Sequence, residues 1–170
     1  MSNFLSQTSQ QKIDEIVNQT LLKVDKIYPD NPLEDIVESY GGIEVLELDF
    51  EEDSEFLLGA VSYPNGDTAP RIFINKDLTP ERKTFTLAHE FGHYLMHKGK
   101  AKLRLDFVEY DGSKEAQEET EANYFAATLL MPKEKFVEIY TLLGNEKLVA
   151  EYFGVSVAAV RNRKTWIDKN

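Results

Sequence analysis

Two histidines four residues apart, with a glutamate directly after the first, are the residues of this sequence best suited to catalysis. They are His89, Glu90 and His93. On an α-helix, side chains four residues apart project from one face, so the two imidazoles can bind a single metal ion. A metal held by two imidazoles and one further protein ligand keeps a position for water and lowers the pKa of that water to about 7. The pattern predicts a hydrolase in which Glu90 is the catalytic base.

The motif has this meaning only on a helix, and the flanking residues predict one. Thr79 suits the N-cap, Pro80 suits the first helical position, and apolar residues then recur at mostly helical spacing. We expect a helix over 80–97 that is stopped by Gly99. Gly92 costs about 1 kcal/mol relative to alanine inside a helix, which indicates that a neighbouring group comes close there.

A third histidine, His97, continues the same four-residue series. A helix rises 1.5 Å per residue, so His89 and His97 lie about 12 Å apart and cannot both bind an ion whose ligands lie at about 2 Å. We interpret His97 as a helix-end residue favoured by the helix dipole, without a direct catalytic role.

The composition indicates an acidic, folded protein. The 170 residues include 42% hydrophobic residues, enough for one well-packed domain, and the net charge of -11 disfavours nonspecific binding to DNA or to anionic membranes. The sequence contains no cysteine, so a zinc site must use histidine and carboxylate ligands. The N-terminus lacks the pattern of a signal peptide, and no apolar run is long enough to span a membrane. We expect a cytoplasmic protein with no membrane association.

Before the motif helix, the sequence predicts two helices and then a small sheet. Apolar residues at helical spacing predict helices over 9–28 and 32–40. Three segments rich in β-branched and large apolar residues predict strands at 43–50, 57–63 and 71–75, with a strong turn signal at 64–67. We expect a largely antiparallel sheet that carries the motif helix. An edge strand beside the metal could hold an extended peptide by backbone pairing.

After the motif helix, residues 100–112 form either a strand or a flap over the cleft, and a better-defined helix follows. Ser113 can cap this helix, and an apolar stripe begins at Ala122 and ends before Pro132. A catalytic zinc site needs a third protein ligand, and the acidic start of this helix is where we expect it.

Three glutamates near the start of this helix are candidates for the third ligand. On a helical wheel Glu118 and Glu119 lie within the apolar stripe, about 40° and 60° to either side of Ala122. Glu121 lies about 100° away on the flank and is the least suited to face inward. Helix geometry does not separate Glu118 from Glu119.

The two helices together resemble the ImmA/IrrE family of zinc metallopeptidases. Residues 85–95 read F-T-L-A-H-E-F-G-H-Y-L, and residues 119–132 read E-T-E-A-N-Y-F-A-A-T-L-L-M-P. In that family an H-E-x-x-H helix is followed by a helix with E-x-x-A-N-x-F-A and a terminal L-L-M-P. The resemblance covers roughly residues 43–132 and implies a minimal zincin fold, Zn²⁺ as the cofactor, and Glu119 as the third ligand, with Asn123 one turn later on the same side.

The same resemblance implies a class of substrate. Members of the family cut or inactivate helix-turn-helix repressors, so the expected partner is a protein substrate, a transcriptional repressor. The ligand set of two imidazoles and one carboxylate also serves Mn²⁺ and Fe²⁺.

The last forty residues predict further helices. A helix is expected over 132–143, and residues 148–166 are similar to helix-turn-helix sequences, with Ser156 as a cap and with Arg161, Arg163 and Lys164 projecting from the second helix. Because the protein is acidic overall, we favour a helical pair that packs on the peptidase core, and we do not expect DNA binding.

The sequence therefore predicts an α+β protein with a zincin-like metallopeptidase domain at 1–132 and a helix-turn-helix-like segment at 133–170. The predicted function is a zinc-dependent endopeptidase with His89, His93 and Glu119 as ligands and Glu90 as the base. Tyr94 and Tyr124 are candidates for stabilising the oxyanion. The alternative is a non-catalytic regulatory protein that binds a repressor or DNA through its C-terminal helices. The sequence does not indicate an oligomeric state.

Overall fold

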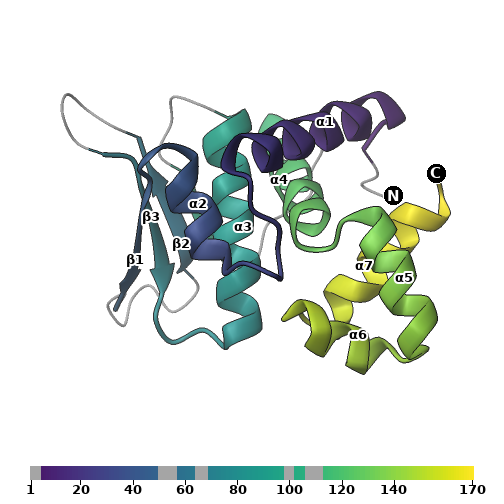
Figure 1. Cartoon of the computed structure of the whole chain (residues 1–170). Coiled ribbons are helices and arrows are strands. Elements are labelled where there is room, and N and C mark those ends of the chain that lie inside the picture. The colour runs from purple at the N-terminus through teal and green to yellow at the C-terminus, as the bar shows by residue number, and fades with distance from the viewer. Residues whose placement is uncertain (1–4, 50–56, 64–68, 98–101, 106–112) are drawn as a thin grey trace.

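The computed structural model describes residues 5–49, 57–63, 69–97, 102–105 and 113–170. The helices are α1 (Gln7–Val24), α2 (Leu33–Gly41), α3 (Pro80–Met96), α4 (Lys114–Leu130), α5 (Lys133–Leu143), α6 (Glu146–Phe153) and α7 (Val157–Asp168). The strands are β1 (Glu44–Leu48), β2 (Leu57–Ser62), β3 (Arg71–Asn75) and β4 (Lys102–Leu105). In Figure 1 the sheet forms one end of the molecule, α2 and α3 lie beside it, and α5, α6 and α7 gather at the other end.

The four strands form one sheet in the order β1-β3-β2-β4. β2 pairs antiparallel with both β3 and β4, whereas β1 pairs parallel with β3, with Glu44 opposite Arg71. The α+β fold and the largely antiparallel sheet are therefore confirmed, with one parallel pair. The segment expected to be a strand or a flap contains β4. The turn expected at 64–67 and the helix stop at Gly99 lie outside the described residues.

Local sequence signals set the start of both helices that matter for the site. Oγ1 of Thr79 accepts a hydrogen bond from the backbone N–H of Arg82, and Pro80 is the first residue of α3. Oγ of Ser113 accepts one from the backbone N–H of Ala116 at the start of α4. Such caps satisfy N–H groups that have no partner within the helix, which is why the predicted starts are accurate.

Gly92 allows α3 and α4 to pack closely. A Cβ atom added at Gly92 would lie 2.8 Å from Cδ1 of Phe125 on α4, closer than carbon atoms approach without a shift. Phe91 and Phe125 pack edge to face, with ring centroids 5.9 Å apart, and both are fully buried. The close approach predicted from Gly92 is confirmed, and it brings the metal motif next to the glutamates of α4.

The C-terminal helices hold one side chain in an unexpected place. Arg163 on α7 is only 3% exposed, and its Nε donates to the backbone oxygen of Met131 and its Nη1 to Oγ1 of Thr128, at 2.9 and 3.2 Å. The prediction that Arg163 projects outward is wrong. Met131 is the C-cap residue of α4, and carbonyl oxygens at a helix end lack partners within the helix; the guanidinium satisfies one of them.

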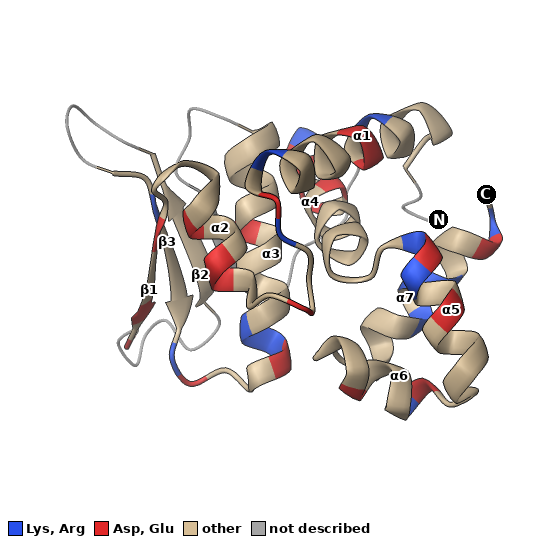
Figure 2. Ribbon diagram, viewed as in Figure 1, with Lys and Arg blue, Asp and Glu red and all other residues tan. Residues whose placement is uncertain are grey.

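The other predicted cations of α7 do project, but they have acidic neighbours. Arg161 forms an ion pair with Glu146 at 2.7 Å, and Lys164 forms one with Asp168 at 2.5 Å. Figure 2 shows acidic as well as basic residues on the helices α5, α6 and α7. These pairs and the burial of Arg163 leave less free positive charge for DNA than the sequence alone indicated.

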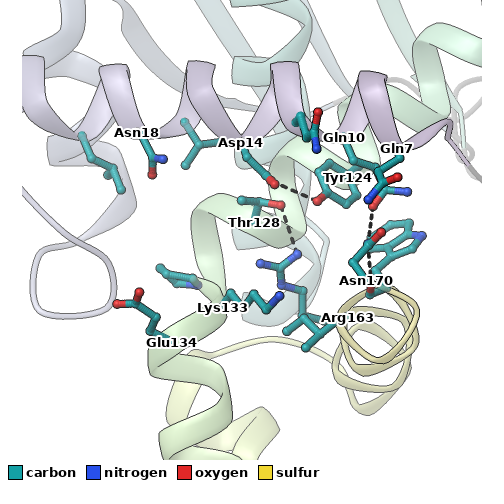
Figure 3. A pocket seen from close by; sticks show the side chains of 16 residues that line it. Gln7, Gln10, Asp14, Asn18, Tyr124, Thr128, Lys133, Glu134, Arg163 and Asn170 are labelled. Atoms are coloured by element: carbon teal, nitrogen blue, oxygen red, sulfur yellow. Dashed lines mark hydrogen bonds between the residues drawn. The ribbon is translucent and has the colours of Figure 1, made fainter.

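A cavity of about 450 Å³ lies where α1, α4 and α7 meet (Figure 3). Its lining includes Asp14, Tyr124 and Arg163, and it contains none of the three residues predicted to bind the metal.

None of the helices in the described part of the chain combines the length and the apolar character needed to cross a membrane.

Candidate metal centre

Three side chains from two helices converge between α3 and α4. Nε2 of His93 lies 3.1 Å from Nε2 of His89 and 2.7 Å from Oε1 of Glu119, and Nε2 of His89 lies 3.0 Å from Oε2 of Glu119. The two histidines are buried, and the side chain of Glu119 is 14% exposed. These three residues are the group of possible metal ligands found among the described residues.

The spacing of these atoms fits a divalent metal. Ligand atoms at about 2.0–2.2 Å from a tetrahedral ion lie roughly 3.3–3.6 Å from one another. The three observed separations, 2.7 to 3.1 Å, are slightly shorter than this range. Two imidazole nitrogens and a carboxylate oxygen are also a common donor set of catalytic zinc sites, and the set leaves a coordination position for water.

The lowered pKa of Glu119 also fits a role as a metal ligand. Burial acts to raise the pKa of this carboxyl, but hydrogen bonds and charge interactions with His89 and His93 outweigh burial and hold the pKa well below its usual value. The carboxyl is therefore ionised, as a metal ligand must be. Glu118, the alternative that helix geometry left open, has its carboxylate 3.9 Å from Nζ of Lys114 and is not part of the group.

The outward nitrogen of each histidine also has a partner. Nδ1 of His89 lies 2.8 Å from Oδ1 of Asn123 on α4. Nδ1 of His93 lies 2.8 Å from Nδ1 of His97, whose Nε2 lies 2.8 Å from Oε2 of Glu121. His97 lies at the end of α3, as expected. Glu121, expected to be the least suited to face inward, is outside the ligand group, but its side chain meets His97 and is only 20% exposed. The sequence did not indicate that they meet each other, although the four-residue series of histidines was a signal that His97 could reach His93.

Glu90, the predicted catalytic base, is fully buried. The strand β2 lies directly against it, because a Cβ added at Gly59 would be 3.2 Å from Cγ of Glu90 and 2.7 Å from Cγ2 of Thr86. Gly59 was missed at the sequence level, since a single glycine in a strand gives no indication of what it contacts. The absence of a side chain at Gly59 allows the sheet to pack on the motif helix at this point.

Tyr63 was missed as well, and its hydroxyl lies at the C-terminal end of α3. Its hydroxyl is 3.0 Å from the backbone oxygens of His93 and His97. Burial and then the charge of Glu90 raise the pKa of Tyr63 to about 12. Tyr94 stacks on Tyr63, with ring centroids 5.7 Å apart.

Of the two tyrosines considered for the oxyanion, Tyr124 is excluded by its position. Its hydroxyl donates to Oδ1 of Asp14 on α1 at 2.9 Å, in the cavity of Figure 3. Tyr124 follows Glu119 by five residues, so its side chain leaves α4 about 140° away from the metal-facing side. Tyr124 lies close to Glu119 in the sequence, but this proximity did not predict the direction of its side chain. A role for Tyr94 in stabilising the oxyanion stays a prediction.

Comparison with known proteins agrees with this geometry. The sequence pattern of the IrrE N-terminal-like domain, Peptidase_M78, matches residues 38–165, which is well over half of the chain. The chain belongs to this metallopeptidase family. The matched range contains α3, α4 and all three residues that converge.

Two proteins similar to this IrrE-type chain add detail. It is 42% identical over 74 residues to the radiation response metalloprotease IrrE of Deinococcus deserti, an alignment that covers 43% of this chain and 26% of that protein. A structure described as a Mycobacterium tuberculosis transcriptional regulator superimposes with a TM-score of 0.61 at 20% identity, over 88% of this chain and 45% of that one. The second likeness concerns the fold alone. The chain thus spans about a quarter of the curated relative and under half of the solved one.

Proposed function

We propose that this chain is a cytoplasmic, zinc-dependent endopeptidase that cleaves a helix-turn-helix repressor protein. The observation that carries the proposal is the convergence of His89, His93 and Glu119 within 4.8 Å of one another, beside a buried Glu90 that follows the first ligand directly. Membership of the IrrE-type family supports the peptidase chemistry. The repressor substrate is inferred from the motif resemblance described above.

In this proposal each residue has a defined task. His89, His93 and Glu119 bind the zinc ion through Nε2, Nε2 and a carboxylate oxygen. A bound zinc ion supplies Lewis acidity for the scissile carbonyl and lowers the pKa of nearby water. Glu90 accepts one proton from the attacking water and then returns it to the nitrogen of the leaving amine, so the carboxylate is regenerated. Residues 1–132 form the metallopeptidase domain that carries this chemistry, and residues 133–170 form a helix-turn-helix-like segment that packs on it and contacts the substrate.

The proposal is tested with Glu90→Gln, which preserves the size of the side chain and removes the base. Purified helix-turn-helix repressors from the same organism, with casein as a generic substrate, are incubated with the zinc-loaded protein, and new termini are identified by mass spectrometry. We expect cleavage of a repressor at one site by the unaltered chain, and at least about a hundredfold slower cleavage by Glu90→Gln. Equal zinc content in both proteins makes the comparison valid. Cleavage by Glu90→Gln at the unaltered rate would contradict the assigned base.

A further inference from the structure

A chain of hydrogen-bonded side chains leads away from the metal-facing side of His93. Its first contact joins Nδ1 of His93 to Nδ1 of His97, and its second joins Nε2 of His97 to Oε2 of Glu121, both at 2.8 Å. The side chain of His97 is 6% exposed and that of Glu121 is 20% exposed, so both contacts are largely shielded from water. This series of hydrogen bonds connects the C-terminal end of α3 to α4.

The positions of the protons in this chain follow from its two ends. An imidazole that binds a metal through Nε2 carries its proton on Nδ1. The Nδ1–H of His93 therefore donates to Nδ1 of His97, which accepts. The neutral ring of His97 then carries its own proton on Nε2 and donates it to the carboxylate of Glu121. Every donor has an acceptor in this arrangement, and the Nε2 lone pair of His93 points to the ligand group.

We propose that His97 and Glu121 are positioning residues for His93. They fix its tautomer and its ring orientation so that Nε2 is ready to bind zinc, a role that rests on the metal site of the proposed function. Asn123 holds His89 in the same way through its contact with Nδ1. The helix α4 thus supplies one ligand and the two anchoring groups, at positions 119, 121 and 123.

The spacing along α3 explains why a third histidine can take this role. His97 is too far from His89 to share its metal, yet it lies one helical turn beyond His93, with ring centroids 5.0 Å apart. It closes α3 as the C-cap residue, and its backbone N–H donates to the oxygen of His93. The eight-residue separation from His89 therefore excludes His97 as a ligand, whereas the four-residue separation from His93 lets it hold that ligand.

The test measures the zinc dissociation constant by chelator competition at fixed pH and salt. His97→Leu removes both contacts, Glu121→Ala removes the outer one, and His97→Gln can restore both, because its carbonyl accepts and its amide donates. Glu118→Ala is the matched control, since it removes a carboxylate from the same helix outside the chain of contacts. We expect zinc affinity to fall about 10–100-fold in His97→Leu and in Glu121→Ala, and to stay within about threefold in His97→Gln and Glu118→Ala.

A second readout follows His93 itself. In zinc-loaded, ¹⁵N-histidine-labelled protein, we expect a slowly exchanging proton on Nδ1 of His93 that exchanges faster in His97→Leu and in Glu121→Ala. Circular dichroism of the metal-free variants establishes that they fold. Unchanged zinc affinity in both His97→Leu and Glu121→Ala would overturn the inference, as would a His97→Gln variant no better than His97→Leu. If the unaltered protein binds no zinc, the proposed function fails and the inference fails with it.

Discussion

Oδ1 of Asn123 lies 2.8 Å from Nδ1 of His89, so the helix that carries Glu119 also orients a histidine of the neighbouring helix. Contacts of this kind decide which ring nitrogen is left for a metal, because the proton resides on the nitrogen that donates. The proposed metal centre therefore depends on two helices being placed accurately against each other.

The first prediction concerns this contact. Asn123→Ala removes the acceptor and should weaken zinc binding about 10–100-fold, whereas Asn123→Asp keeps an acceptor and should bind zinc at least as tightly as the unaltered chain. Chelator competition measures both affinities. Zinc binding by Asn123→Ala as tight as that of the unaltered protein would show that His89 needs no such anchor.

The second prediction concerns the glycine that lets β2 lie against α3. In Gly59→Ala the new Cβ would lie 2.7 Å from Cγ2 of Thr86 and 3.0 Å from the backbone oxygen of Phe73. The expected loss in free energy of unfolding is about 1–3 kcal/mol, because a backbone atom cannot yield easily. The control is Gly41→Ala on α2, where nothing lies within 4 Å and a gain of up to about 1 kcal/mol is expected. Urea denaturation of the metal-free proteins measures the free energy of unfolding of both variants. Equal stability of the two variants would refute the packing argument.

The third prediction concerns the ionisation of Tyr63, whose pKa is raised to about 12 by burial first and by the charge of Glu90 second. Carbon NMR of labelled tyrosine should show a hydroxyl that stays protonated well above pH 10 and is absent in Tyr63→Phe. Glu90→Gln should lower this pKa while leaving it above 10.0, since burial is the larger cause. A Tyr63 pKa unaffected by Glu90→Gln would contradict the contribution of the Glu90 charge.

The same shift has a consequence for stability. Below pH 10 the hydroxyl is protonated in both the folded and the unfolded chain. Between pH 10 and pH 12 the unfolded chain loses this proton while folded Tyr63 keeps it, so the free energy of unfolding falls as the pH rises. In Tyr63→Phe the fall over this interval should be shallower. Denaturation curves at several pH values test the difference.

The fourth prediction separates the two arginines of α7. Arg163→Ala should lower the free energy of unfolding by about 3 kcal/mol, because it removes a buried donor from the backbone oxygen of Met131. Arg161→Ala removes an exposed ion pair with Glu146 and should cost no more than about 1 kcal/mol. Similar losses in both variants would contradict the structural role of Arg163.

Signals that act within one helix were predictable from the sequence. The cap at Thr79 and the motif spacing of His89 and His93 each depend on residues a few positions apart. Local geometry sets these features, so a periodic pattern was enough to locate α3 to within a residue.

Features that depend on how two elements meet were not predictable in the same way. The position of Glu119, and not Glu118, beside the two histidines depends on the rotation of α4 about its axis, which helix geometry left open and the family resemblance implied. The contact between His97 and Glu121, the burial of Arg163 and the parallel pairing of β1 with β3 depend on elements far apart in the sequence. No pattern within either partner encodes them.

The most direct test of the central claim is the metal content of the purified protein after zinc is supplied, measured by mass spectrometry for the unaltered chain, Glu119→Ala and Glu118→Ala. The account predicts about one zinc per chain in the unaltered protein and in Glu118→Ala, and less than about a tenth of that in Glu119→Ala. An unaltered protein without metal, or a Glu119→Ala variant that keeps its zinc, would contradict it.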